Sequence, residues 1–260
     1  TIKDGSHILL SNVEAKSTEN DGISMSNVTD SVIEYFYVHS RRTGSGIHGD
    51  AIEIWGGGNN TVRFSRFAWN GQQIFWGGDR VHGRWDIYGN VFYDAPSAGK
   101  GLHPQSGNPI VGPIYVYNNT FNNFNIAMDL GSNTTGKVMN NIFYNIGSNP
   151  GFGSTEHDYN WFEEGLSSGG ESNAQFGGHP FLSEVYNDYR LTSPTNSGKK
   201  DLGAPYDIDF CSSTRGADGV WDRGAFEFGG TSVCDVSAPG GGGDGSADDG
   251  GGSSGSNSPS

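Results

Sequence analysis

The sequence predicts an all-β solenoid, and three observations lead to this prediction. A strand pattern recurs about six times, in HILLSNVEA, VIEYFYVHS, VRFSRFAW, WDIYGNVFY, YVYNNTFNN and VMNNIFYN. If Leu9, Ile33, Val62, Ile87, Val116 and Val138 fill one position of it, the steps are 24, 29, 25, 29 and 22 residues, which is typical of solenoids. Polar and apolar residues alternate in these segments, as in strands. The 43 glycines and the hydrophobic fraction of 33% fit short strands joined by turns.

A second strand is expected in each repeat: DGISMS at 21–26, DAIEIW at 50–55, QQIFW at 72–76, GLHPQ at 101–105 and IAMDL at 126–130. Alternate side chains of a strand face opposite sides. The predicted inward row is Ile23, Met25, Ile52, Ile54, Ile74, Trp76, Leu102, Ile126, Met128 and Leu130. The predicted outward row is Ser24, Glu53, Trp55, Gln73, Phe75, His103, Gln105, Ala127 and Asp129. An alternative register aligns Trp76 with Trp55 and turns the side chains of 72–76 to the other face.

The period divides the chain into three parts. Residues 1–147 are expected to form the coils, and 148–228 the last coils and an irregular cap. Residues 229–260 are rich in Gly, Ser and Asp and predict a flexible linker, which suggests a further C-terminal module or a cell-surface anchor. Asn27, Asn60, Asn90 and Asn118 fall between strands, where asparagine favours tight turns and can form hydrogen-bonded ladders between coils.

Charge limits the classes of partner. The net charge of −14 and the pI of about 4.7 argue against nucleic-acid binding. No apolar run is long enough to predict a membrane span. From Arg41 to Lys100, however, seven basic residues face five acidic ones, a balance of 7 − 5 = +2. This stretch is compatible either with chance clustering on turns or with a cleft for an anionic ligand.

Three C-terminal segments carry a family resemblance: HPFLSEVYNDYRLTSPTNSG from His179, DIDF from Asp207, and DRGAFEF at 222–228. They resemble the ending of many bacterial secreted or surface β-helix proteins, although His179 stands where that group often has Asp. The coils resemble the pectate-lyase-like right-handed parallel β-helix superfamily. The resemblance implies a single-stranded right-handed parallel β-helix of about six coils with an irregular C-terminal cap. It also implies a secreted or cell-surface bacterial protein. It implies no single activity, because the superfamily includes lyases, hydrolases, esterases and adhesins.

The two cysteines, Cys211 and Cys234, are 23 positions apart near the end of the predicted cap. In a secreted protein they would form one disulfide, which would stabilise the cap by about 2–4 kcal/mol. Neither their spacing nor their neighbours predict a metal site.

The segment GIHGDAIEIW holds the densest group of candidate catalytic residues, His48, Asp50 and Glu53. A histidine beside carboxylates serves as a general base or acid near neutral pH. The carboxylates could instead bind Ca²⁺. Asp50 also has a structural interpretation, since Asp21 and Asp50 occupy equivalent positions at the start of their strands.

A second group comprises Lys100 and His103 in GKGLHPQSG. Pro104 cannot donate to a strand ladder, which predicts an irregular rim at this point. Arg80, His82 and Arg84 lie on a predicted loop, where arginines could bind a carboxylate or sulfate through paired hydrogen bonds. Trp55, Gln73, Phe75, Gln105 and Asp129 complete the predicted substrate-binding face, whose aromatic and polar mixture suits sugar rings.

Three functions fit these residues. The first is a polysaccharide lyase that cleaves a uronate-containing glycan by β-elimination, with His48 or His103 as the base. Arg80, Arg84, Lys100 or a bound Ca²⁺ would then stabilise the developing charge. The second is a glycoside hydrolase that uses Glu53 with Asp50 or Asp129, although several coils at about 4.8 Å each separate Asp129 from Glu53 and weaken that pairing. The third is a non-catalytic adhesin or glycan-binding module, because the chain lacks the paired-aspartate and Gly-His-Gly pattern of polygalacturonases and an obvious Lys/Arg lyase pair.

Overall fold

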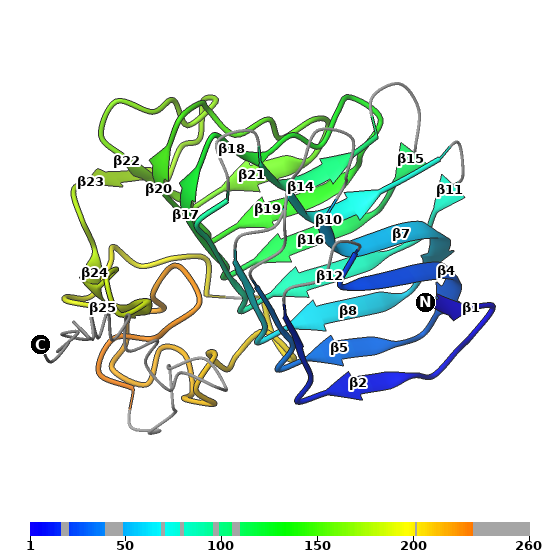
Figure 1. Ribbon diagram of the computed structural model, residues 1–260. Helices are drawn as coiled ribbons and strands as arrows, with labels where there is room; N and C mark the ends of the chain where they lie inside the picture. The colour runs from blue at the N-terminus through cyan, green and yellow to red at the C-terminus, as the bar shows by residue number, and fades with distance from the viewer. Residues whose placement is uncertain are drawn as a thin grey trace, which may run out of the picture.

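The chain is a parallel β-helix with an irregular C-terminal cap (Figure 1). The computed structural model describes residues 1–16, 21–39, 49–68, 71–78, 81–95, 99–105, 110–200 and 202–230. Successive coils add one strand to each of three parallel sheets, so each strand pairs with its equivalent one coil away. The fold class predicted from the repeat is therefore confirmed. Within the described residues, no helix is long and apolar enough to cross a membrane.

The first sheet follows the order β1 (Ile2–Lys3), β4 (Ile23–Thr29), β7 (Asp50–Gly58), β10 (Gln72–Trp76), β14 (Lys100–Pro104) and β18 (Ile126–Met128), with β11 (Val81–His82) and β15 (Ile110–Val111) paired beside it. The second sheet follows β2 (Leu9–Ser11), β5 (Val32–Glu34), β8 (Asn60–Arg63), β12 (Trp85–Tyr88), β16 (Ile114–Tyr117), β19 (Gly136–Met139) and β21 (Glu156–Asp158). The third sheet follows β3 (Glu14–Lys16), β6 (Tyr37–His39), β9 (Arg66–Ala68), β13 (Val91–Tyr93), β17 (Thr120–Phe124), β20 (Ile142–Ile146), β22 (Trp161–Glu163) and β23 (Gln175–Gly177). An antiparallel pair, β24 (Phe181–Ser183) and β25 (Asp188–Leu191), belongs to the cap.

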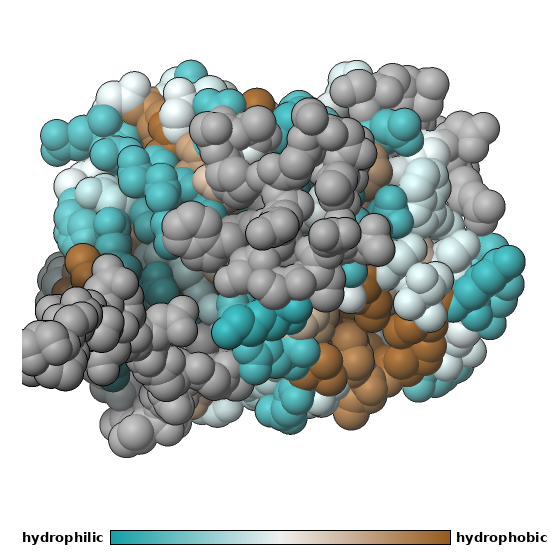
Figure 2. Space-filling view, in the orientation of Figure 1, coloured by the Kyte–Doolittle hydropathy of each residue, from teal (hydrophilic) through white to brown (hydrophobic). Residues whose placement is uncertain are grey.

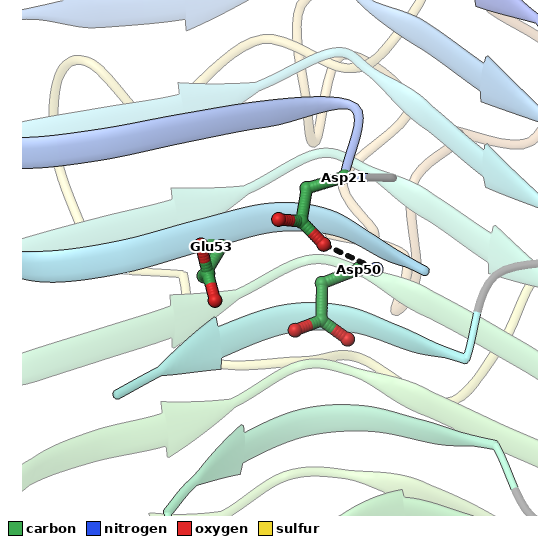
Figure 3. A group of neighbouring side chains, drawn as sticks. All are labelled: Asp21, Asp50 and Glu53. Atoms are coloured by element: carbon green, nitrogen blue, oxygen red, sulfur yellow. Dashed lines mark hydrogen bonds between the residues drawn. The ribbon is translucent and has the colours of Figure 1, made fainter. Parts of the chain in front are cut away.

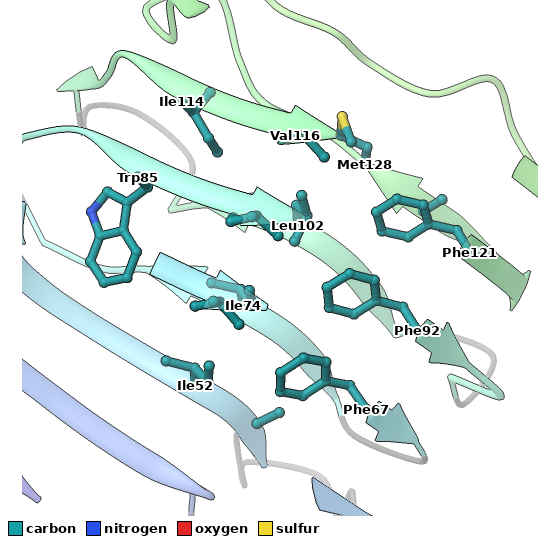
Figure 4. Packing of buried hydrophobic residues seen from close by; sticks show 14 of the residues in the cluster. Ile52, Phe67, Ile74, Trp85, Phe92, Leu102, Ile114, Val116, Phe121 and Met128 are labelled. Atoms are coloured by element: carbon teal, nitrogen blue, oxygen red, sulfur yellow. The ribbon is translucent and has the colours of Figure 1, made fainter. Parts of the chain in front are cut away.

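The interior is filled by columns of equivalent apolar side chains (Figure 4). One column in the first sheet runs through Ile52, Ile74, Leu102 and Met128, all fully buried. Phenylalanines form another column in the third sheet, where the rings of Phe67, Phe92 and Phe121 stack at 4.9 and 4.8 Å. These spacings match the separation of neighbouring strands, so each coil covers the apolar face of the next.

A ladder of buried asparagines runs along the turn between the second and third sheets. Each of Asn90, Asn119 and Asn141 donates its side-chain amide to the Oδ1 of the next member, at 3.0 Å, and the last of these acceptors is Asn160. Each side-chain oxygen also accepts the backbone N–H of the preceding coil's asparagine or serine. The predicted turn positions Asn27 and Asn118 adopt left-handed backbone conformations, with φ of 52° and 55°.

One position of the predicted repeat is shifted by a residue. Leu10, not Leu9, pairs with Ile33 and so begins the column that continues through Val62 and Ile87. Leu9 is instead 64% exposed, because a slip of one residue moves a strand side chain to the opposite face. The other five members of the predicted column pair as expected.

Figure 2 shows a brown, apolar patch beside β2, at the first coil, where Ile2, Ile8, Leu10, Val13 and Ala15 are only partly buried against the core. The cap packs along the side of the solenoid, beside the turn between the second and third sheets (Figure 1). There its Asn187 accepts a hydrogen bond from Arg66 of β9 at 3.0 Å, and its buried Arg223 donates to the backbone carbonyl of Asn160 at 2.8 Å. Asp222 holds the cap together by accepting the backbone N–H groups of Thr195 and Phe228. Cys211 is disulfide-bonded, while its predicted partner Cys234 lies outside the described residues.

Candidate functional site

The outward face of the first sheet carries a row of functional side chains. Glu53 of β7 pairs in register with Phe75 of β10, which pairs with His103 of β14. Asp129 follows one coil later, since its backbone N–H donates to the carbonyl of Leu102. Trp76 pairs with Ile54 and is fully buried. The inward placement of Ile74 and Trp76 and the outward placement of Phe75 are therefore confirmed, and the alternative alignment of Trp76 with Trp55 is wrong.

Lys100, His103 and Asp129 form a compact ionic group on this face. The Nζ of Lys100 lies 3.1 Å from Nε2 of His103 and 3.5 Å from Oδ2 of Asp129. Nδ1 of His103 lies 3.6 Å from the same Asp129 oxygen. His103 itself is buried, and burial lowers the pKa of its imidazole, with the positive charge of Lys100 lowering it further and Asp129 opposing the effect. The imidazole is therefore neutral at neutral pH.

Three carboxylates from the two coils before Phe75 lie close together (Figure 3). One oxygen from each of Asp21, Asp50 and Glu53 lies within 4.8 Å of the other two, and an Asp21 oxygen accepts the backbone N–H of Asp50 at 3.1 Å. Burial raises the pKa of Glu53, and the carboxylate of Asp21 raises it further. Hydrogen bonds with the side chains of Trp55 and Ser24 oppose this rise. Glu53 therefore retains a proton at a higher pH than an ordinary glutamate.

Two half-exposed aromatic rings, those of Trp55 and Phe75, border the acidic group. They close around Gly77, where an added Cβ would lie 3.0 Å from the Trp55 ring and 3.1 Å from the Phe75 ring. The next residue, Gly78, has a φ of 78° and donates its N–H to Oε1 of Gln105 at 2.6 Å. Glycine at 77 thus allows both rings to share one patch of the face, and Gln105 fixes the backbone beside it.

Two predicted binding residues lie elsewhere. Gln73 is fully buried, because it sits between Ala51 and Gly101 at the start of the strands and not beside the open rings. Arg84 precedes β12 in the second sheet, where Asp86 binds its guanidinium at 2.7 and 2.9 Å. It therefore does not reach over the row of Glu53 and His103. His48 and Arg80 lie outside the described residues.

Asp21 was not predicted to belong to a site, but it lies close to Glu53. The repeat could have predicted this, because Asp21 and Asp50 are equivalent residues of adjacent coils, and such residues stack one strand spacing apart. Among the described residues, one group could offer three ligands to a metal ion, and it consists of Asp21, Asp50 and Glu53. Ca²⁺ takes six to eight oxygens, so these three carboxylates alone do not complete a calcium site.

No family model matches the chain, and a search of curated proteins found no match.

Proposed function

We propose that the outward face of β7, β10 and β14 cleaves a uronate-containing polysaccharide by β-elimination. The observation that carries this proposal is the neutral imidazole of His103 with the ammonium of Lys100 3.1 Å away. A lyase needs a base for the proton beside the uronate carboxylate and a cation that neutralises the carboxylate as charge develops. His103 and Lys100 supply both groups at one point of the face.

Glu53 supplies the third group that the reaction needs. Because its pKa is raised, its carboxyl group can hold a proton for the departing sugar oxygen. It stands two strands from His103, about 10 Å at the usual strand spacing, with Phe75 between them. A sugar ring stacked on Phe75 would thus lie between the base and the acid.

The proposed elimination needs no reactant besides the polysaccharide, because side chains of this face take up and return the proton. His103 takes the proton from C5 of the uronate, and Lys100 stabilises the negative charge that spreads onto the carboxylate. The C4–C5 double bond forms as the C4–O bond breaks, and Glu53 protonates the released oxygen. Asp129 contacts both Lys100 and His103 and orients them.

A glycoside hydrolase is the second candidate, and the carboxylate group of Figure 3 favours it. Retaining enzymes place two carboxyl groups about 5–5.5 Å apart, and Glu53 has Asp21 and Asp50 at approximately that range. In that reaction Glu53 would be the acid and Asp21 the nucleophile. Asp129 is three strands from Glu53, about 14 Å at the usual spacing, which is too far for the pairing that the sequence suggested.

The test is mass spectrometry of the products formed from uronate-containing and neutral polysaccharides, with calcium and with a chelator. Fragments that lack one water establish elimination, whereas fully hydrated fragments establish hydrolysis. His103→Gln is expected to reduce elimination by about 10²–10⁴-fold, and the matched control His179→Gln, on the cap, leaves it unchanged. No fragments from any glycan would contradict both reactions and favour a non-catalytic binding module.

Calcium and location belong to the same proposal. A loss of cleavage in chelator that calcium restores would assign a Ca²⁺ to the face, where Asp21, Asp50 and Glu53 are the available ligands. The disulfide at Cys211 is stable in oxidising surroundings, which supports a secreted or cell-surface location.

A further inference from the structure

A hollow of about 360 Å³ lies against the second sheet, away from the face described above. Its wall on the solenoid side comes from the outward residues of β16, β19 and β21, and its other wall comes from Lys199, Leu202 and Tyr206 of the cap. Figure 1 shows the cap, in yellow and orange, beside the ends of this sheet's strands. The lining residues are Arg84, Tyr115, Tyr117, Lys137, Met139, Glu156, Lys199, Leu202 and Tyr206.

Specific hydrogen bonds fix the cap against this sheet, so the wall of the hollow has a defined position. The amide of Asn140 donates to the carbonyl of Lys199 at 3.0 Å and accepts its N–H at 2.7 Å. Tyr206 donates its hydroxyl to Asp86 at 2.5 Å, and its ring meets those of Tyr88 and Tyr117 edge-on at 4.9 and 4.8 Å. The wall that carries Lys199 and Tyr206 is therefore rigidly placed.

Arg84 presents an oriented positive charge to the hollow. The Cζ atom of its guanidinium lies 4.6 Å from the centre of the Tyr115 ring. Its Nε and Nη2 donate hydrogen bonds to the two carboxylate oxygens of Asp86. Nη1 of Arg84 makes no hydrogen bond within the described part of the chain, and the side chain is 47% exposed. A guanidinium held in this way is suited to a carboxylate or sulfate group.

The charge around the hollow is opposite to that of the whole protein. Arg84, Lys137 and Lys199 contribute three positive charges to the lining, against the negative charges of Glu156 in the lining and of Asp86 behind Arg84. One positive charge is left over, in a chain of net charge −14. Glu156 pairs with Lys137 at 2.8 Å, but the side chains of Lys137 and Glu156 are 44% and 61% exposed, so this ion pair is weak and can exchange with an external anion. An anion could therefore replace Glu156 at Lys137.

We propose that this hollow is a second, non-catalytic binding site for an anionic saccharide. Tyr115, the partly exposed tyrosine of the lining, offers its ring and hydroxyl group to a sugar, whereas Tyr117 and Tyr206 are buried and support the wall. The cations select a carboxylate or sulfate group on the sugar. Its volume lies within the range of small-ligand sites, about 300–1,000 Å³. The site lies on a different sheet from His103 and does not require that the other face be catalytic.

Methionine provides a local reporter for this proposal. The chain has three methionines, of which Met139 lines the hollow, while Met25 and Met128 are buried in the core beneath the first sheet. Protein labelled at the methionine methyl carbons should give three NMR signals, assigned through a Met139→Leu variant. Titration with trigalacturonate should shift the Met139 signal in a saturable and salt-sensitive way, with a smaller effect at Met25 and Met128.

Lys137→Gln should weaken this binding by about 3–10-fold, within the range of one exposed ion pair. The control Lys3→Gln, at an exposed lysine of β1, should leave it unchanged. The neutral trisaccharide maltotriose should shift nothing. The proposal is overturned if Met139 does not respond, if maltotriose shifts it equally, or if inorganic sulfate alone displaces trigalacturonate at equal concentration. Cleavage activity is measured separately, so its absence would contradict the proposed lyase without affecting this result.

Discussion

Lys100 and His103, three residues apart on β14, bring their side-chain nitrogens within 3.1 Å of each other. An ammonium so close to an imidazole opposes its protonation, and burial of the ring acts in the same direction. The imidazole of His103 therefore stays neutral to a lower pH than that of an ordinary histidine.

The acid limb of the pH–rate profile should lie below the ordinary histidine pKa of about 6.5, because the pKa of His103 is lowered in the folded protein. Lys100→Met removes the repulsive charge and leaves Asp129, so the pKa of His103 and the acid limb should move to higher pH. NMR titration of the imidazole measures the pKa even where activity is lost. An unchanged pKa in Lys100→Met, with Lys3→Met as the control, would contradict this electrostatic coupling.

Glu53 should lose its proton more readily in Asp21→Asn. The neutral amide removes the negative charge that helps to raise the pKa of Glu53. If Glu53 is the general acid, the alkaline limb of the pH–rate profile should move to lower pH, and Glu53→Gln should slow cleavage by about 10²–10⁴-fold. Asp30→Asn, an exposed aspartate in the turn before β5, is the control. Identical alkaline limbs in Asp21→Asn and in the control would remove Glu53 from this role.

Asn119→Ala should destabilise the solenoid by several kcal/mol. The Asn119 amide donates to the carbonyl of Ile87 and to Asn141, and its oxygen accepts the backbone N–H of Asn90. Its loss removes the side-chain partner of the Ile87 carbonyl and of the Asn90 N–H, at about 1–3 kcal/mol for each buried group left unsatisfied, while the Asn141 oxygen keeps the backbone N–H of residue 119. Chemical denaturation measures the change. Asn125→Ala replaces an exposed asparagine of a neighbouring turn and should change stability little. Equal effects would show that the ladder contributes nothing specific.

The cap should become less stable as the pH rises from about 4.5 to about 7. Burial raises the pKa of Glu227 from 4.5 to about 7, opposed by the Gly216 N–H and by Arg215. The folded protein therefore binds more protons than the unfolded chain in this interval, so stability present at low pH is lost as Glu227 ionises. Thermal unfolding of Glu227→Gln should lose this pH dependence, whereas a dependence that persists would assign it to another group.

The architecture was predictable because the same strand pattern recurs in each coil of a solenoid. Five members of the column from Ile33 to Val138 sit where alternation and period place them. Leu9 was misplaced because both Leu9 and Leu10 are apolar at the edge of the repeat, and only pairing with β5 decides which of them faces inward.

The candidate sites were less predictable, for a physical reason. Alternation on one strand correctly put Glu53, Phe75 and His103 on one face. The position of Arg84 depends on its contacts with Asp86 and Tyr206, and Tyr206 comes from a cap with no periodicity. The approach of Asp21 to Glu53 depends on the stacking of adjacent coils, which a single strand does not encode.

The cap joins coils that are far apart along the solenoid. Arg66 of β9 donates to the carbonyl of Asn187 at 3.0 Å, Tyr206 donates to Asp86 of β12, and Arg223 donates to the carbonyl of Asn160 just before β22. Coils of a solenoid otherwise contact only their neighbours, so these long-range bonds should make the coils from β7 to β22 open as one cooperative unit. Amide hydrogen exchange should then give similar opening free energies across these coils, and both proposed sites should be protected together.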